Sequence, residues 1–438
     1  MTRRNFVATS AASVAASPAV VKGNGTRPAL LGGQPVRSEP FTSWPVCDQT
    51  EEQGLVTVLN SRKWGRTRGN VVDRFEAEYS KLTGAKHCLA VANGTSALLT
   101  ALNSLEIQAG DEVILPPYTF VATVNAILQR HALPVFADID PATFQLDPKK
   151  AEALITDRTA AIIPVHIGGS AADLDSFSAL GKKRNIPILE DACQAHLAEW
   201  RGRHVGTQGA MGCFSFQASK NLNSGEGGAV LTNDDELAAR AFAVHNNSTG
   251  RATGGHDFSR RVTGSNFRLT EFQASLLLSQ MTRIERFAKK RDENARYLTE
   301  RFLEIPGITP AKMYEGCTRN AYHLYMFRYD KTQFAGLPRA KFLKAMSAER
   351  IPCSGGYTPL NAEPLIENTL KSRGYQRIYS AERLKRWREQ NVCPLDDQLC
   401  QEGVWFTQNM LVGSRTDMEQ IVEAVRKIQR HAGELAQS

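Results

Sequence analysis

Two stretches decide the fold, Ile188-Leu-Glu-Asp-Ala-Cys-Gln-Ala-His196 and Cys213-Phe-Ser-Phe-Gln-Ala-Ser-Lys220. In each, an apolar run typical of a buried strand leads into polar side chains. The first run ends on two acids, Glu190 and Asp191, and the second leads to Lys220. Ligands of parallel sheets bind beyond the carboxyl ends of the strands, so we expect an acid and the lysine to meet at one edge of a sheet.

Strand-like and helix-like segments alternate on both sides of these stretches. The predicted strands are His87–Ala92, Glu112–Leu115, Pro134–Ala137, Ala160–Val165, Ile186–Glu190, Met211–Phe216 and Ala229–Thr232. The predicted helices between them include Ser96–Leu105, Val121–Leu128 and Leu174–Lys183. This alternation predicts an α/β fold, with a mostly parallel central sheet flanked by helices on both faces.

The pattern changes beyond Arg268. A helix-like stretch runs from Leu269 to about Leu303, and Pro306-Gly307 ends it. The elements predicted after it are a strand over Tyr322–Arg328 and helices over Arg339–Ala348 and Asp417–His431. We therefore predict a large domain over residues 28–288 and a smaller C-terminal α/β domain over residues 289–438.

The composition is that of an ordinary globular protein, with 42% hydrophobic and 22% charged residues in a chain of 438. The net charge of +8 comes largely from one cluster: Lys371, Arg373, Arg377, Arg383, Lys385, Arg386 and Arg388. A nucleic-acid patch is one interpretation. No recognition helix or interleaved aromatic motif accompanies the cluster, so we favour a solvated helix face and predict no nucleic-acid partner.

The eight cysteines show neither a C-x-x-C motif nor the Cys/His spacing of a zinc site. Several of them, including Cys88, Cys193 and Cys213, lie in apolar strand-like segments, where buried thiols are common. We therefore predict packing residues and no metal site.

The amino terminus differs from the rest of the chain. Met1-Thr-Arg-Arg-Asn-Phe6 precedes a weakly apolar, Ala/Ser-rich stretch over Val7–Val21, so residues 1–27 resemble a twin-arginine export signal. The stretch is too short and too polar to span a membrane. We expect export of a folded, cofactor-loaded protein; the alternative is a basic tail on a cytoplasmic enzyme.

A carboxylate and a lysine placed in this way suit pyridoxal 5'-phosphate (PLP), which forms a Schiff base with a lysine while an acid keeps its pyridine nitrogen protonated. Burial would lower the pKa of Lys220 toward the working range of such an amine. Asp191 is the predicted partner of the ring nitrogen, and the alternative is helix capping. Glu190 competes for that role, but neighbouring strand residues face opposite sides of a sheet, so only one acid can meet the ring.

Further polar groups could hold the rest of the cofactor. Gly94 and Thr95 open a predicted helix, whose N–H groups and dipole suit a phosphate; the alternative is simple capping. Ser215 offers a second phosphate hydroxyl or is an ordinary strand serine. Phe120 stacks on the pyridine ring or belongs to the core. Gln194 reaches the phenolic oxygen of the cofactor or faces solvent.

With these residues assembled, the chain resembles the DegT/StrS-type sugar aminotransferases, PLP enzymes of fold type I, from about Leu30 to Arg430. The motifs that carry the resemblance are Asn93-Gly-Thr-Ser-Ala-Leu98, Pro117-Tyr-Thr-Phe-Val-Ala-Thr123, Pro164-Val-His166, Glu190-Asp-Ala-Cys-Gln-Ala-His196, Phe214-Ser-Phe216 with Lys220 and Gly225-Glu-Gly-Gly228, and Gly264-Ser-Asn-Phe-Arg-Leu269. The interval from Asp191 to Lys220 also matches the family.

The resemblance implies a role for each matching residue. Lys220 would be the Schiff-base lysine, Asp191 would meet the pyridine nitrogen and Gln194 the phenolic oxygen. The remaining cofactor contacts would be Phe120 on the ring and Gly94, Thr95 and Ser215 on the phosphate. Asn266 would reach the phosphate from the neighbouring subunit, which implies a homodimer with shared active sites.

Two departures from the family pattern concern the lining of the site. Leu197 stands where the family usually has glycine, and Asn221-Leu-Asn-Ser224 replaces a segment that commonly contains threonine. Candidates to face the substrate, from their loop positions, are Trp64, Arg66, His323 and Tyr357.

Three segments look most like the branch of cyclitol (inosose) aminotransferases and aminohydroxybenzoate synthases. They are Leu31-Gly-Gly-Gln-Pro-Val-Arg37 with Trp44-Pro45, Arg319-Asn-Ala-Tyr-His323 with Met326-Phe-Arg328, and Val404-Trp-Phe-Thr-Gln408.

The resemblance therefore implies transfer of an amino group from glutamate or glutamine to a keto group on a sugar, nucleotide-sugar or cyclitol. The alternatives are a PLP-dependent sugar dehydratase, an aminohydroxybenzoate-synthase-like enzyme, and a non-catalytic PLP-binding or sensory protein. Dehydratase relatives replace the lysine with histidine, so Lys220 argues against the first of these. The intact set of Lys220, Asp191 and Ser215 argues against a pure binder.

Overall fold

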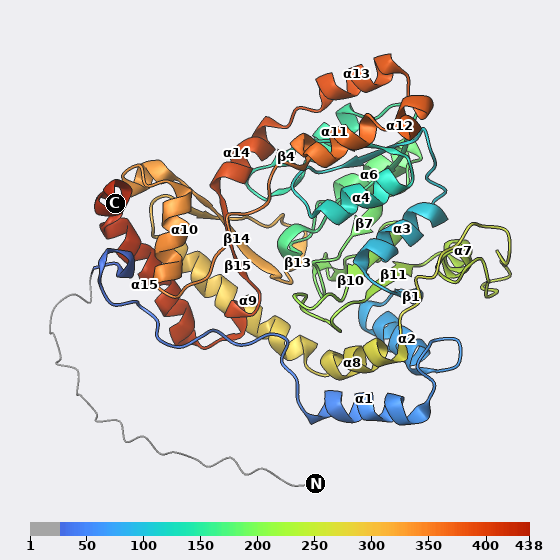
Figure 1. Ribbon diagram of the computed structural model, residues 1–438, viewed down its shortest axis with the longest axis horizontal. Coiled ribbons are helices and arrows are strands. Elements are labelled where there is room, and N and C mark those ends of the chain that lie inside the picture. Colours follow the sequence, from blue (N-terminus) through green and yellow to red (C-terminus); the bar gives the residue numbers. More distant parts are fainter. Residues whose placement is uncertain (1–26) are drawn as a thin grey trace, which may run out of the picture.

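The computed structural model describes residues 27–438 (Figure 1). The twin-arginine segment predicted over residues 1–27 falls outside the described residues, apart from its last position, and stays a prediction. Within residues 27–438, no helix combines the length and the apolar character needed to cross a membrane.

A mostly parallel sheet forms the centre of the molecule. Four strands pair in the order β1 (His87–Val91), β11 (Gly228–Thr232), β10 (Met211–Ser215) and β7 (Leu189–Asp191), and three in the order β3 (Leu133–Phe136), β2 (Glu112–Leu115) and β6 (Thr159–Ile162). Parallel bridges from Ile162 to Ile188 and from Val165 to Asp191 join the two groups. Only β11 runs antiparallel to its neighbours among these strands. The predicted α/β class is confirmed.

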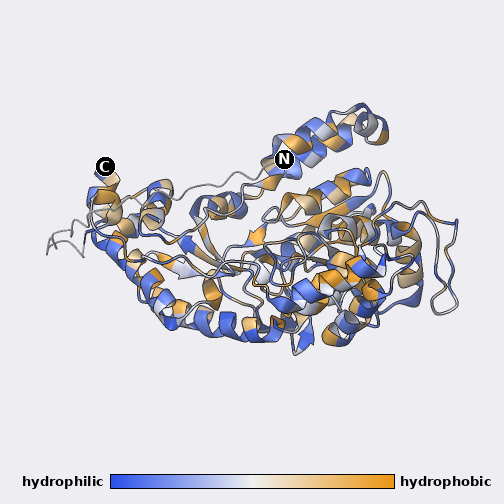
Figure 2. Cartoon of the chain, turned by 60° about the horizontal axis from the view of Figure 1, so that its bottom comes forward, coloured by the Kyte–Doolittle hydropathy of each residue, from blue (hydrophilic) through white to orange (hydrophobic). Residues whose placement is uncertain are grey.

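Side chains that alternate along the strands build a core on each face of the sheet. In β10, Met211 and Cys213 join the core on one face, while Phe214 joins the core on the other. The first core contains residues of α3 (Gly94–Ser104) and α4 (Val121–Gln129), and the second contains residues of α2 (Val71–Thr83) and α8 (Glu271–Met281). The helices around the sheet show both apolar and polar stripes (Figure 2). A parallel sheet buried on both faces explains why the strands read as continuous apolar runs.

The helix expected over Leu269–Leu303 is two helices. It divides into α8 and α9 (Ile284–Phe302), with Thr282 and Arg283 between them. The Thr282 hydroxyl donates to the carbonyl of Ser279 (2.7 Å), a local bond that competes with the helical ladder. The Arg283 side chain donates to Asp48 (2.6 Å) at the start of α1 (Gln49–Ser61), so the break also anchors α1.

A second, antiparallel sheet lies in the C-terminal part. Strands β12 (Ile308–Pro310), β14 (Leu324–Tyr329) and β15 (Gly403–Thr407) pack with α9, α10 (Arg339–Ala348) and α15 (Arg415–Arg430) around a core of their own. The remaining elements are α5 (Pro148–Ala153), α6 (Leu174–Arg184), α7 (Asp235–His245), α14 (Pro394–Glu402) and α16 (Ala432–Gln437), with the short strands β4 (Ile139–Asp140), β5 (Gln145–Leu146), β8 (Glu199–Trp200), β9 (Arg203–His204) and β13 (Cys317–Arg319). The boundary at residue 288 stays a prediction.

Helices α11 (Pro364–Leu370), α12 (Arg373–Ile378) and α13 (Ala381–Gln390) lie over the large sheet (Figure 1). The Tyr375 hydroxyl donates to the carbonyl of Ala132 (2.8 Å), and Trp387 Nε1 donates to the carbonyl of Pro134 (2.6 Å). These helices fall inside the range predicted for the small domain, yet their apolar side chains belong to the core of the large sheet.

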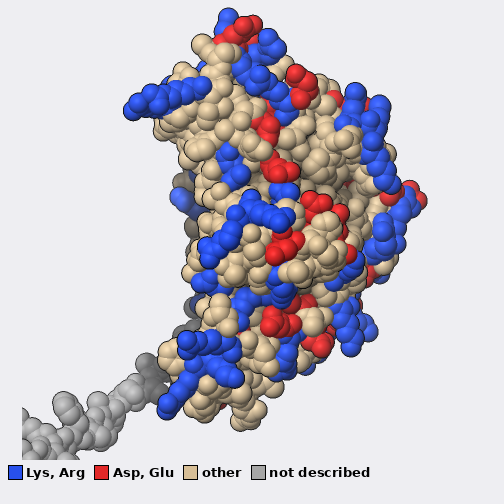
Figure 3. All heavy atoms as spheres, turned by 90° about the vertical axis from the view of Figure 1, so that its right-hand side faces the viewer, with Lys and Arg blue, Asp and Glu red and all other residues tan. Residues whose placement is uncertain are grey.

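The basic cluster lies on α12 and α13, with Lys371 in the turn between α11 and α12. Arg383 Nε donates to Glu112 Oε1 (2.8 Å), and Arg388 NH2 lies 3.0 Å from Glu367 Oε1. Figure 3 shows Lys and Arg interspersed with Asp and Glu over the side of the molecule that is at the right in Figure 1. The cationic side chains are thus distributed among acidic partners.

Leu197 adopts the left-handed conformation, with φ of 66°, at the position where the family usually has glycine. Its side chain is nevertheless buried in the core on the α2 face. The left-handed region costs a non-glycine residue about 1–2 kcal/mol, while truncating a buried leucine to alanine costs about 2–5 kcal/mol. Burial therefore outweighs strain, and leucine is tolerated.

We expect both Leu197→Ala and Leu197→Gly to lower the free energy of unfolding. The glycine variant should be the more stable of the two by about 1 kcal/mol, because only glycine relieves the backbone strain. Urea unfolding of the three proteins measures this order. The usual order, with alanine more stable than glycine, would show that the backbone here is not strained.

Candidate active site

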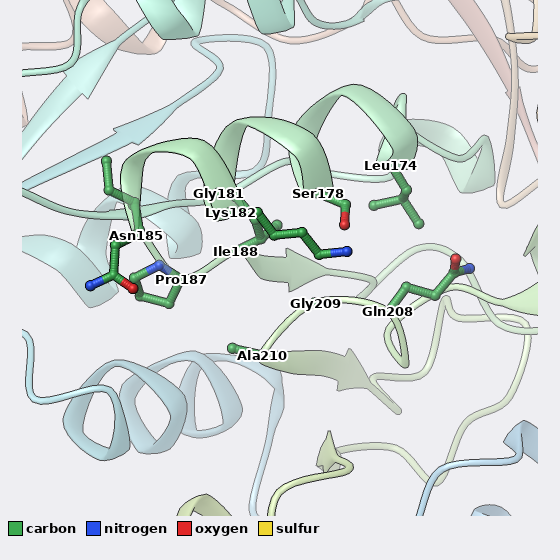
Figure 4. Close-up of a pocket in the computed structure, with 11 residues that line it drawn as sticks. Leu174, Ser178, Gly181, Lys182, Asn185, Pro187, Ile188, Gln208, Gly209 and Ala210 are labelled. Atoms are coloured by element: carbon green, nitrogen blue, oxygen red, sulfur yellow. The ribbon is translucent and has the colours of Figure 1, made fainter.

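Seven predicted site residues line one cavity of about 640 Å³ beyond the carboxyl ends of β7 and β10. They are Gly94, Thr95, Phe120, Asp191, Gln194, Ser215 and Lys220. Residues of both sheets contribute to the wall, because His323, Tyr357 and Trp405 line it from the C-terminal part of the chain. A second hollow, of about 390 Å³, lies between α6 and the amino ends of β7 and β10 (Figure 4), away from these groups.

Lys220 lies in the turn after β10, and its backbone is held from three sides. Its carbonyl accepts hydrogen bonds from Trp44 Nε1 (3.0 Å) and Asn223 Nδ2 (3.2 Å), and the preceding carbonyl of Ser219 accepts from Gln408 Nε2 (3.4 Å). Burial lowers the pKa of Lys220, and the charges of nearby groups such as Asp191 only partly offset the effect. The amine is thus easier to deprotonate than a surface lysine, as a nucleophile requires.

Asp191 closes strand β7 and is almost completely buried. Its Oδ2 accepts a hydrogen bond from Thr123 Oγ1 (2.7 Å), and its Oδ1 accepts from the backbone N–H of Cys193 (3.2 Å). These bonds fix the carboxylate against the wall of the cavity, in a position suited to a protonated ring nitrogen.

Glu190 points to the opposite side of the sheet. Its carboxylate accepts from the backbone N–H groups of Gly206 (2.6 Å), Gln208 (2.7 Å) and Gly209 (2.6 Å), and His166 Nε2 lies 2.9 Å from Oε2. Burial alone would raise the pKa of Glu190, but the bonds from His166 and the backbone outweigh it and leave the pKa below its usual value. Glu190 is therefore a structural anion, and Asp191 is the acid that faces the cavity.

The start of α3 forms the end of the cavity suited to phosphate. Asn93 caps the helix by accepting from the N–H of Ser96 (2.8 Å), and the N–H groups of the first turn have no intrahelical acceptor. Gly94 lies so close to Ser215 that an added Cβ would be 2.7 Å from the Cβ of that serine. Absence of a side chain at Gly94 thus allows the helix start and the Ser215 hydroxyl to face one small anion together. The residues present fit PLP.

Phe120 precedes α4, lines the cavity and is 58% exposed. It is not the core residue of the alternative interpretation, and its free ring face is available for stacking. Asn266 is exposed and does not line the cavity of its own chain. Its predicted contribution from a neighbouring subunit stays a prediction.

Of the residues suggested to face the substrate, His323 and Tyr357 line the cavity. Arg66 instead forms a buried pair with Glu76, with NH2 2.7 Å from Oε2, and Trp64 lies on the surface. Burial, reinforced by the positive charge of Lys220, lowers the pKa of His323 well below its usual value, so this imidazole is neutral.

Arg291 is a buried supporting residue that the sequence did not reveal. Its guanidinium donates through Nε to Gln408 Oε1 (3.0 Å) and lies 5.1 Å from the ring centre of Trp44. Gln408 and Trp44 are the side chains that hold the backbone at Ser219 and Lys220. Burial lowers the pKa of Arg291 to about 9. No sequence signal pairs these positions, because Arg291 and Gln408 are 117 residues apart.

Within residues 27–438, no group of three or more His, Cys, Asp or Glu side chains is arranged to hold a metal ion. His196, although it belongs to the aspartate motif, is buried between the Tyr79 hydroxyl (3.1 Å) and the carbonyl of Ser215 (2.8 Å). Burial lowers its pKa to about 3, so it acts as a neutral structural group.

Comparison with known proteins gives the family. The family model described as the DegT/DnrJ/EryC1/StrS aminotransferase family matches residues 46–404. The chain belongs to this family. The resemblance inferred from the sequence motifs is therefore confirmed, and with it a PLP-dependent aminotransferase of fold type I.

Relatives of this aminotransferase cover nearly its whole length. A putative L-glutamine:3-amino-2,3-dideoxy-scyllo-inosose aminotransferase of Streptoalloteichus tenebrarius is 38% identical over 93% of the chain and 99% of the relative. The L-glutamine:2-deoxy-scyllo-inosose aminotransferase of Streptomyces kanamyceticus is 35% identical over 94% of the chain and 99% of the relative. The crystal structure of 3-amino-5-hydroxybenzoic acid synthase superposes with a TM-score of 0.78, at 30% identity over 90% of the chain and 99% of that structure. These matches confirm the predicted branch.

The two adjacent acids should respond differently to removal of charge. We expect Glu190→Gln to lower the free energy of unfolding at pH 7 on the order of 3 kcal/mol, because an amide would meet a ring of N–H donors. Asp191→Asn should lower the free energy of unfolding by no more than about 1.5 kcal/mol, because the Thr123 hydroxyl can rotate and accept a hydrogen bond from the new amide.

Urea unfolding across pH checks this difference. Because the folded pKa of Glu190 is depressed below the usual 4.5, its charge stabilises the protein fully above that value and progressively less as the pH falls through the folded pKa. The difference in free energy of unfolding between the wild-type protein and Glu190→Gln should therefore become smaller as the pH is lowered. Equal costs for the two variants would contradict the structural role of Glu190.

Proposed function

We propose that this aminotransferase moves an amino group from L-glutamine or L-glutamate to the keto group of a cyclitol. The relatives named for inosose substrates support a cyclitol, and their names support glutamine as the donor. The charged residues that line the cavity favour a cyclitol over a nucleotide-linked sugar as the acceptor.

Of the charged side chains in the described part of the chain, only Asp191, Lys220 and Glu226 line the cavity. A nucleotide-linked sugar would bring a diphosphate, which proteins usually bind with arginine or lysine. Lys220 is the one cation of the lining, and the proposed chemistry occupies it. Neutral groups such as His323 and Tyr357 instead suit the hydroxyl groups of an uncharged ring.

The residues of the chain then have the following roles. PLP, when bound, supplies an electron sink for the charge that develops on the substrate carbon. Asp191, held by Thr123, would keep a proton on the pyridine nitrogen. The start of α3 and Ser215 would hold the phosphate, and Phe120 would stack on the ring.

Lys220 performs the proton transfers. Its amine would take the proton from the α-carbon of the amino-acid donor and later return a proton. With PLP bound, the amino group would stay on the cofactor, and water would release the rest of the donor as an oxo acid. With the keto acceptor the same steps run in reverse, leaving an amine on the ring carbon. The lowered pKa of Lys220 supports this role because the base must be neutral to accept a proton.

The absorption spectrum of the purified protein with PLP tests the proposal. We expect a visible cofactor band that bleaches with L-glutamine or L-glutamate and returns with 2-deoxy-scyllo-inosose or another keto-cyclitol. Lys220→Ala should lose about 10²–10⁴-fold in turnover. Lys150→Ala, which removes a lysine that pairs with Asp138 outside the cavity lining, serves as the matched control and should keep its turnover.

Each other outcome has a distinct meaning. Return of the band only with nucleotide-linked keto-sugars would show that the acceptor class is wrong. A band that ignores every amino-acid donor would contradict transamination and favour a binding protein. Turnover by Lys220→Ala close to that of the wild-type enzyme would contradict the role of the lysine.

We also propose that the enzyme acts as a homodimer in which Asn266 completes the site of the neighbouring subunit. Two features support this. Asn266 is exposed and lies outside its own cavity. In addition, Val56, Leu59 and Trp64 expose about half of their side chains on and just after α1. Exposed apolar groups gathered in one region are typical of an interface.

Mixing two inactive variants tests the shared site. We expect Lys220→Ala and Asn266→Ala to be impaired separately, and activity to reappear when their subunits are exchanged, because each mixed dimer then holds one site with both intact residues. Sedimentation measures the dimer itself. Absence of recovery, with subunit exchange verified, would place Asn266 outside the partner's site.

A further inference from the structure

Gln194 has an amide whose orientation its surroundings determine. The backbone N–H of Gly168, which can only donate, lies 2.8 Å from Gln194 Oε1. A flipped amide would set N–H groups against this N–H, so Nε2 must point the other way. In that direction it meets the hydroxyl of Tyr357 at 2.8 Å.

The Tyr357 hydroxyl must therefore accept the hydrogen bond from Gln194, because an amide Nε2 can only donate. Its own proton remains unused: no other hydrogen-bond partner of this hydroxyl is found among residues 27–438. Burial raises the pKa of Tyr357 to about 12, so the proton stays in place near neutral pH. The cavity wall thus contains a hydroxyl donor that the protein itself does not satisfy.

The ring of Tyr357 is packed between two other aromatic rings. It meets Tyr118 edge to face at 5.3 Å and Trp405 at 4.8 Å between centroids. This packing leaves the hydroxyl little freedom to move, so its position is set before a substrate enters. A fixed donor discriminates between substrates better than a mobile one, because it cannot turn toward water or another acceptor without cost.

We propose that Tyr357 donates this hydrogen bond to a hydroxyl oxygen of the cyclitol acceptor and thereby determines its specificity. The inference rests on the proposed function. The amino-acid donor is a poorer partner, because its carboxylate calls for a cation, and Lys220, the one cation of the described cavity lining, is taken up by the proposed chemistry. An uncharged alcohol oxygen matches both the neutral wall and the single available proton.

The experiment compares Tyr357→Phe with Tyr118→Phe in the two half-reactions, each followed by the cofactor band. Both substitutions delete one hydroxyl and keep the ring, but the Tyr118 hydroxyl finds no hydrogen-bond partner among residues 27–438 and does not line the cavity. We expect Tyr357→Phe to lower kcat/KM with the keto-cyclitol by about 10- to 100-fold and to change the donor half-reaction less than about 2-fold. Tyr118→Phe should leave both half-reactions unchanged.

A series of acceptors that each lack one ring hydroxyl locates the contact. The wild-type enzyme should reject one member of the series, and Tyr357→Phe should lose that discrimination while retaining the rest. A merely structural role would not produce this selective loss.

The outcomes separate this inference from the proposed function. A wild-type enzyme that transfers no amino group to any keto-cyclitol would overturn both. If the wild-type enzyme works and Tyr357→Phe equals it, only the role of Tyr357 is overturned. An equal loss in both half-reactions with a shifted cofactor band would show that the hydroxyl acts only by orienting Gln194, and a loss confined to the donor half-reaction would assign it to the amino acid.

Discussion

The parallel pairing of β7 with β10 is the constraint on which the site depends. Its register sets Glu190 opposite Gly212 and Asp191 opposite Cys213, seven residues before Lys220, which lies in the turn after β10. The pleat then turns the two adjacent acids to opposite faces, one toward the loop at Gly206–Gly209 and the other into the cavity. A slip of one residue would exchange them and leave both carboxylates without their donors.

The sequence predicted this part of the molecule well because it is governed by local patterns. Continuous apolar runs mark strands that are buried on both faces, and the positions just after them mark the edge where ligands bind. The period of two implied that only one of Glu190 and Asp191 could meet the ring, and in the structure Asp191 is the one that lines the cavity. The role of Phe120 could not be predicted in this way, because a core position and a stacking position both favour an aromatic residue. Only its exposure in the structure distinguishes the stacking role from the core role.

What the sequence could not supply depends on contacts between distant segments. Helices α11–α13 join the core of the large sheet because Tyr375 and Trp387 find carbonyl acceptors there, and nothing in their own pattern indicates which sheet they cover. Gln408 accepts a hydrogen bond from Arg291 and donates one to the carbonyl of Ser219, next to Lys220. Arg291 and Gln408 are far apart in the sequence. A helix break without glycine or proline is equally invisible, since at Thr282 it depends on a side-chain bond that propensities do not describe.

These distant contacts have one electrostatic consequence. By excluding water, they make the charged forms of Lys220 and His323 unfavourable and keep Tyr357 protonated. The cavity therefore combines a reactive amine with a wall of neutral hydrogen-bonding groups. In such a wall a substrate is selected less by attraction of charge than by the cost of leaving a buried donor unpaired. That cost falls on any ring whose oxygen is absent or misplaced, which is the form of selectivity that an enzyme acting on polyhydroxy rings of similar size requires.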